Sequence, residues 1–482
     1  MKFNEFLGGF EYLMRKPRDA ESFREYEYIL KFKKSEKILK DISGNLPKVA
    51  FIFPNNYEIA SGSLAWSWIQ QLLSQQGIGV ERFFYEKWFK KFYSLESQIP
   101  IDEFPVWLIT FQFENDLLNI ADILIKKGIP LKANERNEYH PLIIIGGPTT
   151  LFNYKIVEEI ADLVFIGDIE CSITQFSEAL KYYIDSRLVD KFLDVNEIYS
   201  KKFGKIKFSK CFGTLFPVPH SHYVSSMSSF KNKMLIEIGR GCIWRCAFCV
   251  TGYTKKPVKF AKIDDIVEIF EKYKNNEIEY GLISATITDY PYLDELLDYV
   301  EKNKVKFSVS SMRIDKVNER LLRVLKETNQ YSFTVAPEGI SQKIRDVMMK
   351  DMSTDDIING LILGRKVGFD SVKLYYIIGL EEEDEKDYND FFEFIKEVQK
   401  MGYKNITLSI NPLVPKPMTP FEKRNMISKK EYENRMLKIK KSLPKNVKAD
   451  FESYKESFIQ YEIAYLSGED VIYYIAKFFP IS

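Results

Sequence analysis

The chain has 482 residues, of which 45% are hydrophobic, so it is long enough for two or three domains with sizeable cores. Its 69 basic and 68 acidic residues leave a net charge of +1, which excludes a strong overall field for a polyanion such as nucleic acid. Because no apolar run approaches the ~20 residues that span a bilayer and the first residues lack a secretory signal, we expect a cytoplasmic protein with no membrane association.

The first half of the chain alternates short apolar runs with helical stretches. Residues 1–47 are polar and are expected to be helical. The pattern then predicts strands at 48–53, 80–85, 106–111, 142–145 and 163–166. Helices are predicted at 61–76, 115–127, 154–161 and 170–183. Strands that alternate with helices form a parallel, doubly wound sheet, so we assign residues 48–183 to an α/β domain of this type.

Gly146 and Gly147 end the predicted strand at 142–145. Parallel sheets of this kind bind ligands at the carboxyl edge, where this pair lies. Two adjacent glycines leave the backbone open for the close approach of a flat ligand, but a tight turn can also need glycine for its dihedral angles. The sequence leaves both interpretations open.

The second half repeats a strand–helix unit six times. Residues 184–233 are predicted to be a linker, and residues 428–482 to be a small C-terminal α+β extension. One helix begins at Ser353, with Asp356 three residues later as a capping box. The repeat predicts a partial (βα)6 barrel over residues 234–427. Its strands are expected at 234–239, 280–286, 305–311, 331–336, 371–378 and 405–410.

Cys242, Cys246 and Cys249 form a Cys-x3-Cys-x2-Cys motif just after the first of these strands. Three thiolates on one loop can hold three irons of a [4Fe–4S] cluster and leave the fourth iron open. A structural zinc site would need a fourth Cys or His nearby, and none lies between Gly252 and the next predicted strand. The motif therefore predicts a cluster at the carboxyl end of the barrel, where barrel enzymes place their chemistry.

The remaining cysteines, Cys171 and Cys211, are isolated in the sequence. We expect both to be reduced thiols, in keeping with a cytosolic protein.

The cysteine motif, with Phe248 just before its last cysteine, resembles the radical S-adenosylmethionine (radical SAM) superfamily. In that superfamily the open iron chelates SAM, and an electron from the cluster cleaves SAM to release a 5′-deoxyadenosyl radical. Residues 48–480 resemble the group of this superfamily that has an N-terminal cobalamin-binding-like domain. The segments that carry this resemblance are 53–58, 146–149, 161–170, 336–345, 374–380 and 412–421.

The resemblance implies cofactor contacts at the ends of the later strands. Phe248 would pack near the SAM adenine, or else within its own loop. Ser284 and Thr286 stand where the family often has Gly-Gly-Glu, so they or backbone carbonyls would bind the SAM amino group. Ser310 and Arg313 would meet the ribose or the carboxylate, since the guanidinium fork suits a carboxylate.

Three further positions follow from the same resemblance. Glu338 would accept hydrogen bonds from the ribose hydroxyls, and Arg345 would pair with Glu338 or with SAM. Gly379 would allow close approach near the adenine, although Glu381–Glu383 replaces the family's usual Pro-Gly in the loop that follows. Each polar residue could instead belong to a structural ion pair.

The resemblance leaves cobalamin open. The chain has no Asp-x-His-x-x-Gly, and its only histidines are His140, His220 and His222. The first domain could bind cobalamin at Gly146 and Gly147 without a histidine ligand, or it could only shape the substrate cleft. The pair His220 and His222 could bind a metal or lie in a solvated linker.

The resemblance implies an enzyme that transfers a methyl or related group to an unactivated carbon of RNA, a protein or a small molecule. It also implies an electron donor of the flavodoxin or ferredoxin type. One alternative is a rearrangement or sulfur-insertion enzyme that needs no cobalamin. Another is a non-catalytic Fe–S sensor, which would not release 5′-deoxyadenosine. The lysine runs at 255–262 and 429–448 could bind RNA phosphates or be solvated surfaces.

Overall fold

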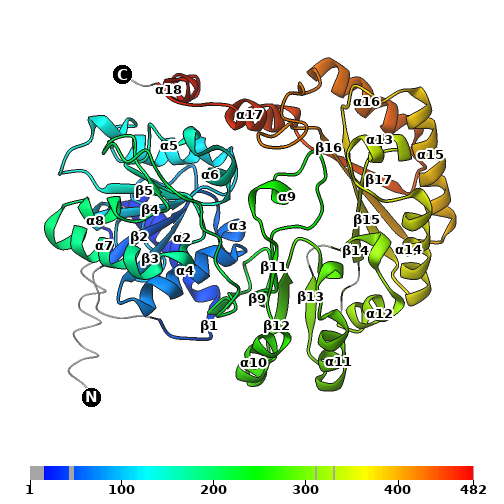
Figure 1. The fold of residues 1–482 in the computed structure, drawn as a ribbon, viewed down its shortest axis with the longest axis horizontal. Helices are drawn as coiled ribbons and strands as arrows, with labels where there is room; N and C mark the ends of the chain where they lie inside the picture. The colour runs from blue at the N-terminus through cyan, green and yellow to red at the C-terminus, as the bar shows by residue number, and fades with distance from the viewer. Residues whose placement is uncertain (1–15, 43–47, 310–311, 329, 331, 481–482) are drawn as a thin grey trace. The chain divides into compact units, whose positions relative to one another are not determined.

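The computed structural model describes residues 16–42, 48–309, 312–328, 330 and 332–480. The chain divides into two compact units (Figure 1). The first contains residues up to Gly213, His220–Met234 and the residues from Tyr465 onward, and the second contains Thr214–Pro219 and Leu235–Ala464. Every helix within the described ranges is too short or too polar to cross a bilayer.

The first unit contains a six-stranded sheet in the order β3-β2-β4-β5-β6-β7. All neighbouring strands are parallel except β6 and β7. The order places β3 and β4 on opposite sides of β2, so the chain reverses direction across the sheet, which confirms the predicted doubly wound topology. The strands are β2 (Lys48–Phe53), β3 (Gly79–Phe84), β4 (Val106–Thr110), β5 (Leu142–Gly146), β6 (Leu163–Phe165) and β7 (Ile198–Tyr199).

The helices of this unit follow the predicted positions except near residue 154. The predicted helix at 154–161 is wrong, because the helix begins earlier, at Pro148. The fixed φ of proline suits the first helical position, so the turn after β5 leads directly into a helix that ends at Asn153. The helices are α3 (Tyr57–Ser61), α4 (Leu64–Gln75), α5 (Asp116–Lys126), α6 (Pro148–Asn153), α7 (Ile173–Ser186) and α8 (Asp190–Leu193).

The N-terminal segment and the predicted linker both add to this unit. Helix α2 (Ala20–Ser35) leads into β1 (Glu36–Ile38), which pairs antiparallel with β8 (Tyr223–Ser225). The buried guanidinium of Arg82, on β3, lies 2.6 Å from the Glu36 carboxylate and so joins β1 to the sheet. Residues 184–233 therefore contain two paired strands, β7 and β8, rather than a plain connection.

The C-terminal residues return to the first unit. Helix α18 (Glu469–Ala476) follows a segment in which the Leu466 carbonyl accepts a hydrogen bond from the Asn153 amide at 3.1 Å. Lys132 forms an ion pair with Glu469 at 2.8 Å. The residues around α18 thus belong to the first unit, although the strands that precede them in the chain belong to the second.

The second unit contains the six predicted strand–helix repeats and a seventh strand, β17, which comes from the predicted C-terminal extension and pairs with β16. Strands β14, β15, β16 and β17 form a parallel sheet in sequence order, and a second sheet has the order β13-β12-β9. Among the described residues no ladder joins the two sheets, so the predicted barrel is open. The strands are β9 (Lys233–Glu237), β12 (Glu279–Ile283), β13 (Phe307–Val309), β14 (Ser332–Glu338), β15 (Ser371–Ile378), β16 (Asn405–Pro412) and β17 (Val447–Phe451).

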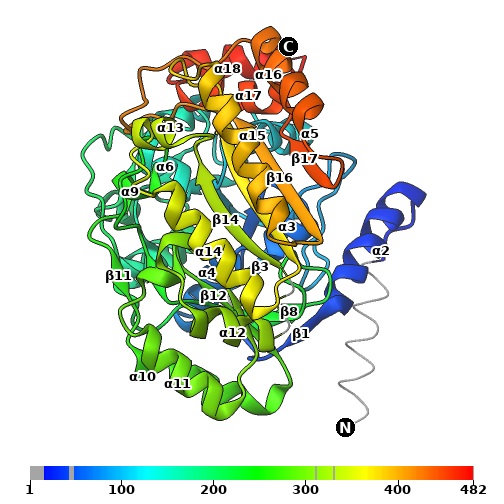
Figure 2. The same ribbon diagram turned by 90° about the vertical axis from the view of Figure 1, so that its right-hand side faces the viewer.

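Helices α14 and α15 cover one face of the β14–β16 sheet (Figure 2). Gly364 of α14 lies close against the Phe333 ring of β14, and Tyr376 of β15 meets Phe391 of α15 edge to face at 4.9 Å. The predicted capping box at Ser353 is present. The helices of this unit are α9 (Thr251–Thr254), α10 (Ile263–Tyr273), α11 (Leu293–Asn303), α12 (Glu319–Glu327), α13 (Gln342–Val347), α14 (Thr354–Val367), α15 (Glu385–Lys400), α16 (Lys429–Ser442) and α17 (Tyr454–Ala464).

Candidate active site

The three cysteines of the motif lie on one closed loop of the second unit. Strand β10 (Gly239–Arg240) pairs antiparallel with β11 (Lys259–Phe260), so residues 241–258 leave and return at the same place (Figure 1). We call residues 241–258 the Cys loop. Its three thiols are free; Cys246 is buried, and the other two are partly exposed.

Two glycines let the Cys loop fold back on itself. Gly241 has φ +87°, and a Cβ there would lie 2.5 Å from the Lys255 carbonyl oxygen. A Cβ at Gly252 would lie 2.2 Å from the Trp244 carbonyl oxygen. Such separations exclude any side chain, so the loop needs glycine at both positions to bring its two halves together.

The backbone around Cys246 is held from two sides. The Ala247 N–H donates to the Met348 carbonyl at 2.8 Å, and the Ala247 carbonyl accepts from the Phe421 N–H at 3.2 Å. Met348 follows α13, and Phe421 lies in the 412–421 segment that the resemblance singled out. Both segments therefore anchor the loop directly.

Trp244 of the Cys loop lies between an arginine and a carboxylate. The Arg313 guanidinium lies 3.6 Å from the centre of the Trp244 ring, a cation–π geometry. The indole N–H donates to Asp289 at 2.8 Å, and the Thr286 hydroxyl donates to the same carboxylate. Sequence reasoning missed Trp244 and Asp289, although a tryptophan between two of the cysteines was the signal available.

The Arg313 guanidinium is buried and binds other groups of the protein. It is 3% exposed, bonds to Asp315 at 3.0 Å, and donates to the carbonyls of Lys350, at 3.0 Å, and Asp351. With these partners and the indole ring, Arg313 holds the Cys loop in position. A role for Arg313 in binding SAM stays a prediction.

Glu338 ends β14 in a left-handed conformation, with φ +65°. Its carboxylate lies 3.6 Å from the ammonium of Lys350, which is 8% exposed. Burial raises the pKa of Glu338, and the Lys350 charge opposes that rise. Arg345 donates instead to the carbonyls of Met352, at 3.0 Å, and Gly339, at 3.3 Å. The residue that pairs with Glu338 is thus Lys350, which sequence reasoning missed.

The predicted residues of the earlier strands lie near the start of the Cys loop. The Ser284 hydroxyl donates to the Thr286 carbonyl at 3.2 Å, and a Cβ at Gly239 would lie 2.6 Å from the Ser284 Oγ. Phe248 is partly exposed on the loop. Ser310 lies outside the described residues. A role for these residues in binding SAM stays a prediction.

Gly379 lies close to a side chain of the protein, and its predicted position near the SAM adenine stays a prediction. It adopts φ +106°, and a Cβ there would lie 2.9 Å from the side chain of Ile427. The N–H groups of Gly379 and Leu380 both donate to the Glu383 carboxylate, at 2.7 and 2.9 Å. Arg435 binds the same carboxylate at 2.5 Å. Glu383 therefore closes the loop that the family usually builds with Pro-Gly.

Two family models match the chain in succession. The model described as radical SAM proteins, N-terminal, matches residues 73–198, and that of the radical SAM superfamily matches residues 236–395, which include the Cys loop. The chain is a radical SAM enzyme. An uncharacterized protein of Methanocaldococcus jannaschii is 29% identical over 426 residues, which is 86% of this chain and 88% of the relative.

Further similarities connect this radical SAM enzyme to characterised proteins. The ribosomal protein uS12 methylthiotransferase RimO of Chlamydia felis is 22% identical over 50% of this chain and 55% of its own length. A structure of the cobalamin-dependent SAM radical enzyme OxsB, with aqua-cobalamin and SAM bound, aligns with a TM-score of 0.54 at 12% identity. The alignment covers 83% of this chain and 62% of OxsB, and at this identity it shows a shared fold.

The superfamily implies SAM and a [4Fe–4S] cluster, and the Cys loop suits the cluster. Among the described residues no three His, Cys, Asp or Glu side chains converge on a single ion. A cluster presents a separate iron to each thiolate, so the three cysteines need not meet at one point. Burial raises the pKa of Cys242 and Cys246, and the nearby Cys249 adds to both shifts, whereas the charge of Lys350 opposes them. Iron binding would keep these thiols deprotonated.

The glycine pair of the first unit packs against the protein's own backbone. Gly147 has φ +126°, and a Cβ there would lie 2.7 Å from the Phe111 carbonyl oxygen. A Cβ at Gly146 would lie 3.3 Å from that of Phe165. The Phe111 N–H donates to the Gly146 carbonyl at 2.6 Å. The turn after β5 therefore needs glycine for its dihedral angle and for the approach of the next strand.

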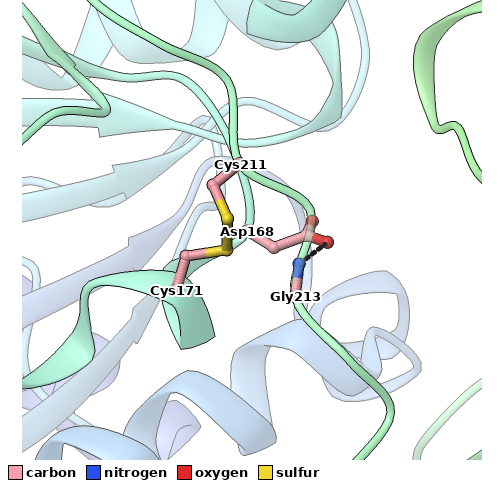
Figure 3. Close-up of a disulfide and its surroundings, with 4 residues drawn as sticks. All are labelled: Asp168, Cys171, Cys211 and Gly213. Atoms are coloured by element: carbon pink, nitrogen blue, oxygen red, sulfur yellow. Dashed lines mark hydrogen bonds between the residues drawn. A yellow bond between two sulfur atoms is a disulfide. The ribbon is translucent and has the colours of Figure 1, made fainter.

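A disulfide crosses the end of β6 (Figure 3). Cys171 and Cys211 are bonded, which contradicts the expectation of two reduced thiols. The Asp168 N–H donates to the Cys211 carbonyl at 2.9 Å, and the Asp168 carboxylate accepts from the Gly213 N–H at 3.2 Å. These bonds bring together cysteines 40 residues apart in sequence. We call residues 209–213 the strap.

The two histidines of the predicted linker lie beside α4. His222 is buried, and its Nδ1 lies 2.8 Å from the Ser67 hydroxyl. Burial lowers its pKa, and the nearby charge of Arg82 adds to this shift. The His220 carbonyl accepts a hydrogen bond from Gln71 at 2.6 Å. Both residues hold β8 against α4.

Proposed function

We propose that this radical SAM enzyme transfers a methyl or related group to an unactivated carbon of RNA, a protein or a small molecule. The observation that carries the proposal is the Cys loop, with three free thiols on a loop anchored from both sides. Three protein ligands leave one iron of a [4Fe–4S] cluster open for SAM. Similarity to a methylthiotransferase favours group transfer over a sensor role.

The residues around the loop have separate roles in this proposal. When bound, the cluster supplies the electron that cleaves SAM. The thiolates of Cys242, Cys246 and Cys249 hold it, and Trp244 and Arg313 keep the loop in place. Glu338 is proposed to accept hydrogen bonds from SAM, because among the described residues its carboxylate forms one ion pair, with Lys350 at 3.6 Å.

Cobalamin has no step in the proposed reaction. The cobalamin site suggested by the sequence needs glycines whose backbone is open to the close approach of the macrocycle. In the first unit, Gly147 backs onto Phe111, and a Cβ at Gly167 would lie 2.9 Å from the Cys211 carbonyl oxygen of the strap. Because the chain's own backbone fills both faces, these residues do not fit a macrocycle. This favours the second candidate function, sulfur insertion or rearrangement without cobalamin.

The test is anaerobic turnover of the reconstituted enzyme with SAM and dithionite. We expect 5′-deoxyadenosine, or S-adenosylhomocysteine if methyl transfer dominates, and neither product from Cys246→Ala. Glu338→Ala should weaken SAM binding by roughly tenfold to a hundredfold, since a hydrogen bond to a charged group contributes about 1.5–3 kcal/mol. No SAM cleavage by a protein with full iron content would favour a sensor.

A parallel experiment addresses cobalamin. Wild-type protein is incubated anaerobically with hydroxocobalamin, freed of excess and read by its corrinoid spectrum. We expect no stoichiometric retention. Retention would restore the cobalamin-dependent form of the proposal.

The proposal includes an external reductant of the flavodoxin or ferredoxin type and a cytoplasmic location. Reductive cleavage of SAM consumes an electron that a superfamily enzyme takes from outside. The Cys171–Cys211 disulfide bears on the location, because such bonds are rare in the cytosol. Counting thiols in protein from anaerobically lysed cells tests whether the bond forms in the cell.

A further inference from the structure

Lys350 breaks the usual pattern of burial in the turn that follows α13. The lysine is 8% exposed, whereas the neighbouring methionine, Met349, is 50% exposed. Lysine is almost never this buried unless it is paired, and methionine prefers the interior. Met349 and Asp351 both have positive φ, of 53° and 48°, so the backbone is bent on each side of the lysine. Burying the lysine ammonium costs free energy, and so do the two positive φ angles of the turn. The burial of this charge therefore points to a functional role for it.

The turn is joined to the Cys loop on both sides of Cys246. The Met348 carbonyl accepts a hydrogen bond from Ala247 at 2.8 Å. The Lys350 carbonyl accepts from Arg313 at 3.0 Å, and that guanidinium lies on the ring of Trp244. Residues 244 and 247 lie on either side of Cys246, so the backbone of the turn that carries Lys350 is tied to the Cys loop on both sides of this cysteine.

The charge of Lys350 is only partly balanced. Its carboxylate partner, Glu338, lies at 3.6 Å, longer than the ~2.7–2.9 Å of a strong charge-assisted hydrogen bond. Burial raises the pKa of the Cys246 and Cys242 thiols, and the Lys350 charge opposes that rise in both. Arg313 likewise opposes it at Cys246, whereas Asp289 adds to it at Cys242.

A buried cation beside a cluster changes its reduction potential. The three thiolates make the bound cluster negative, and reduction adds one more electron. Attraction to a fixed positive charge is therefore stronger in the reduced form, and the low-dielectric surroundings increase the effect. We propose that Lys350 raises the reduction potential of the [4Fe–4S] cluster and so determines how strong an external donor the enzyme needs. In this step the donor loses one electron and the cluster gains it, with no change in covalent bonds.

The inference rests on the cluster-binding role proposed for the Cys loop, so the experiment measures the cluster before its potential. Wild type, Lys350→Met, Lys350→Gln and Lys350→Arg are reconstituted anaerobically without SAM, and iron and sulfide are counted. The potential then follows from an EPR-monitored titration. Lys262→Met, at an exposed lysine just after the loop, is the matched control for loss of a charge in water.

We expect equal iron content in all variants and a lower potential for the Met and Gln variants. The reduction equilibrium should move at least tenfold, ~59 mV for one electron. Lys350→Arg and Lys262→Met should match wild type. Glu338→Gln should move the potential in the opposite direction, because it removes the negative charge that partly balances Lys350.

The outcomes separate the two proposals. A wild type that binds no iron would contradict the proposed function. A full cluster with the same potential in wild type, Lys350→Met and Lys350→Gln would overturn the role of Lys350 and leave the proposed function standing. Loss of the cluster in the Met and Gln variants, with retention in the Arg variant, would also overturn it, because Lys350 would then serve the structure of the loop.

Discussion

The Cys loop and the carboxyl edge of the first unit's sheet both place glycines where a strand meets a loop, but the glycines do different things. In the Cys loop, Gly241 and Gly252 bring two halves of one loop together, and the three cysteines of the loop form no disulfide. At the sheet edge, Gly147 and Gly167 admit neighbouring backbone. A glycine at a strand end therefore indicates that another group lies close to its backbone. That group can be another segment of the protein and need not be a ligand.

The cysteines give the largest expected contrast. Cys242→Ala, Cys246→Ala and Cys249→Ala should each abolish the [4Fe–4S] cluster. The loop supplies three thiolates, and each of them binds one iron of the cluster. Cys171→Ala and Cys211→Ala should retain it, because they lie in the other unit. Iron and sulfide analysis after anaerobic reconstitution is the measurement. A cluster lost only in Cys211→Ala would refute the ligand assignment.

The glycines test the comparison itself. Gly252→Ala should remove most of the bound iron, since its Cβ would meet the Trp244 backbone at 2.2 Å and force the loop open. Gly147→Ala should leave the iron unchanged and lower the free energy of unfolding by about 1–3 kcal/mol through overpacking. Gly128→Ala, which has open space around it, is the control. The iron content and the free energy of unfolding in urea are measured for each variant. Equal loss of iron in Gly252→Ala and Gly147→Ala would contradict the different roles of the two glycines.

Asp116 makes the sheet edge sensitive to pH. It begins α5 and is bonded to Asn55 at 3.3 Å, and burial raises its pKa from 3.8 to about 7. The pKa of Asp116 is higher in the folded protein than in the unfolded chain, so protonation of this carboxyl stabilises the fold. This stabilisation is complete below pH 3.8 and is lost as the pH rises through 7. At 1.36 kcal/mol per pKa unit, the change is at most about 4 kcal/mol.

Unfolding free energies of wild type and Asp116→Asn, measured from pH 4 to 8, test this expectation. The wild type should lose stability relative to the variant as the pH rises. A constant difference across the range would show that the carboxyl keeps an ordinary pKa. The measurement also distinguishes the sheet edge from the Cys loop. The amount of bound [4Fe–4S] cluster should not change as Asp116 titrates.

The disulfide should have the smallest effect on the cluster and a moderate one on stability. Replacing Cys171 and Cys211 together by serine should lower the free energy of unfolding by roughly 2–4 kcal/mol, since the bond closes a loop of 40 residues in the unfolded chain. Chemical unfolding of this variant and wild type, both without reductant, is the measurement. If dithiothreitol destabilises the wild type and the serine variant equally, the bond does not contribute.

Much of the architecture follows from local patterns in the sequence. Apolar runs separated by amphipathic helices predicted the parallel sheet and the six strand–helix repeats, because burial on both faces of a parallel strand needs a continuous apolar run. The spacing of the three cysteines likewise predicted the Cys loop, because ligands within eight residues need no tertiary contact to come together. The helix predicted at 154–161 was misplaced, because Pro148 begins it earlier, and the strands β7 and β8 within the predicted linker were missed.

The tertiary structure alone decided which charged residues serve the loop. Arg313 and Glu338 were visible as strand-end residues, but their partners Trp244 and Lys350 come from other parts of the chain. The Cys171–Cys211 bond likewise depends on the strap crossing the end of β6. Sequence spacing determines contacts within one turn or loop, whereas contacts between distant segments depend on how the strands pair, and no local pattern records that pairing.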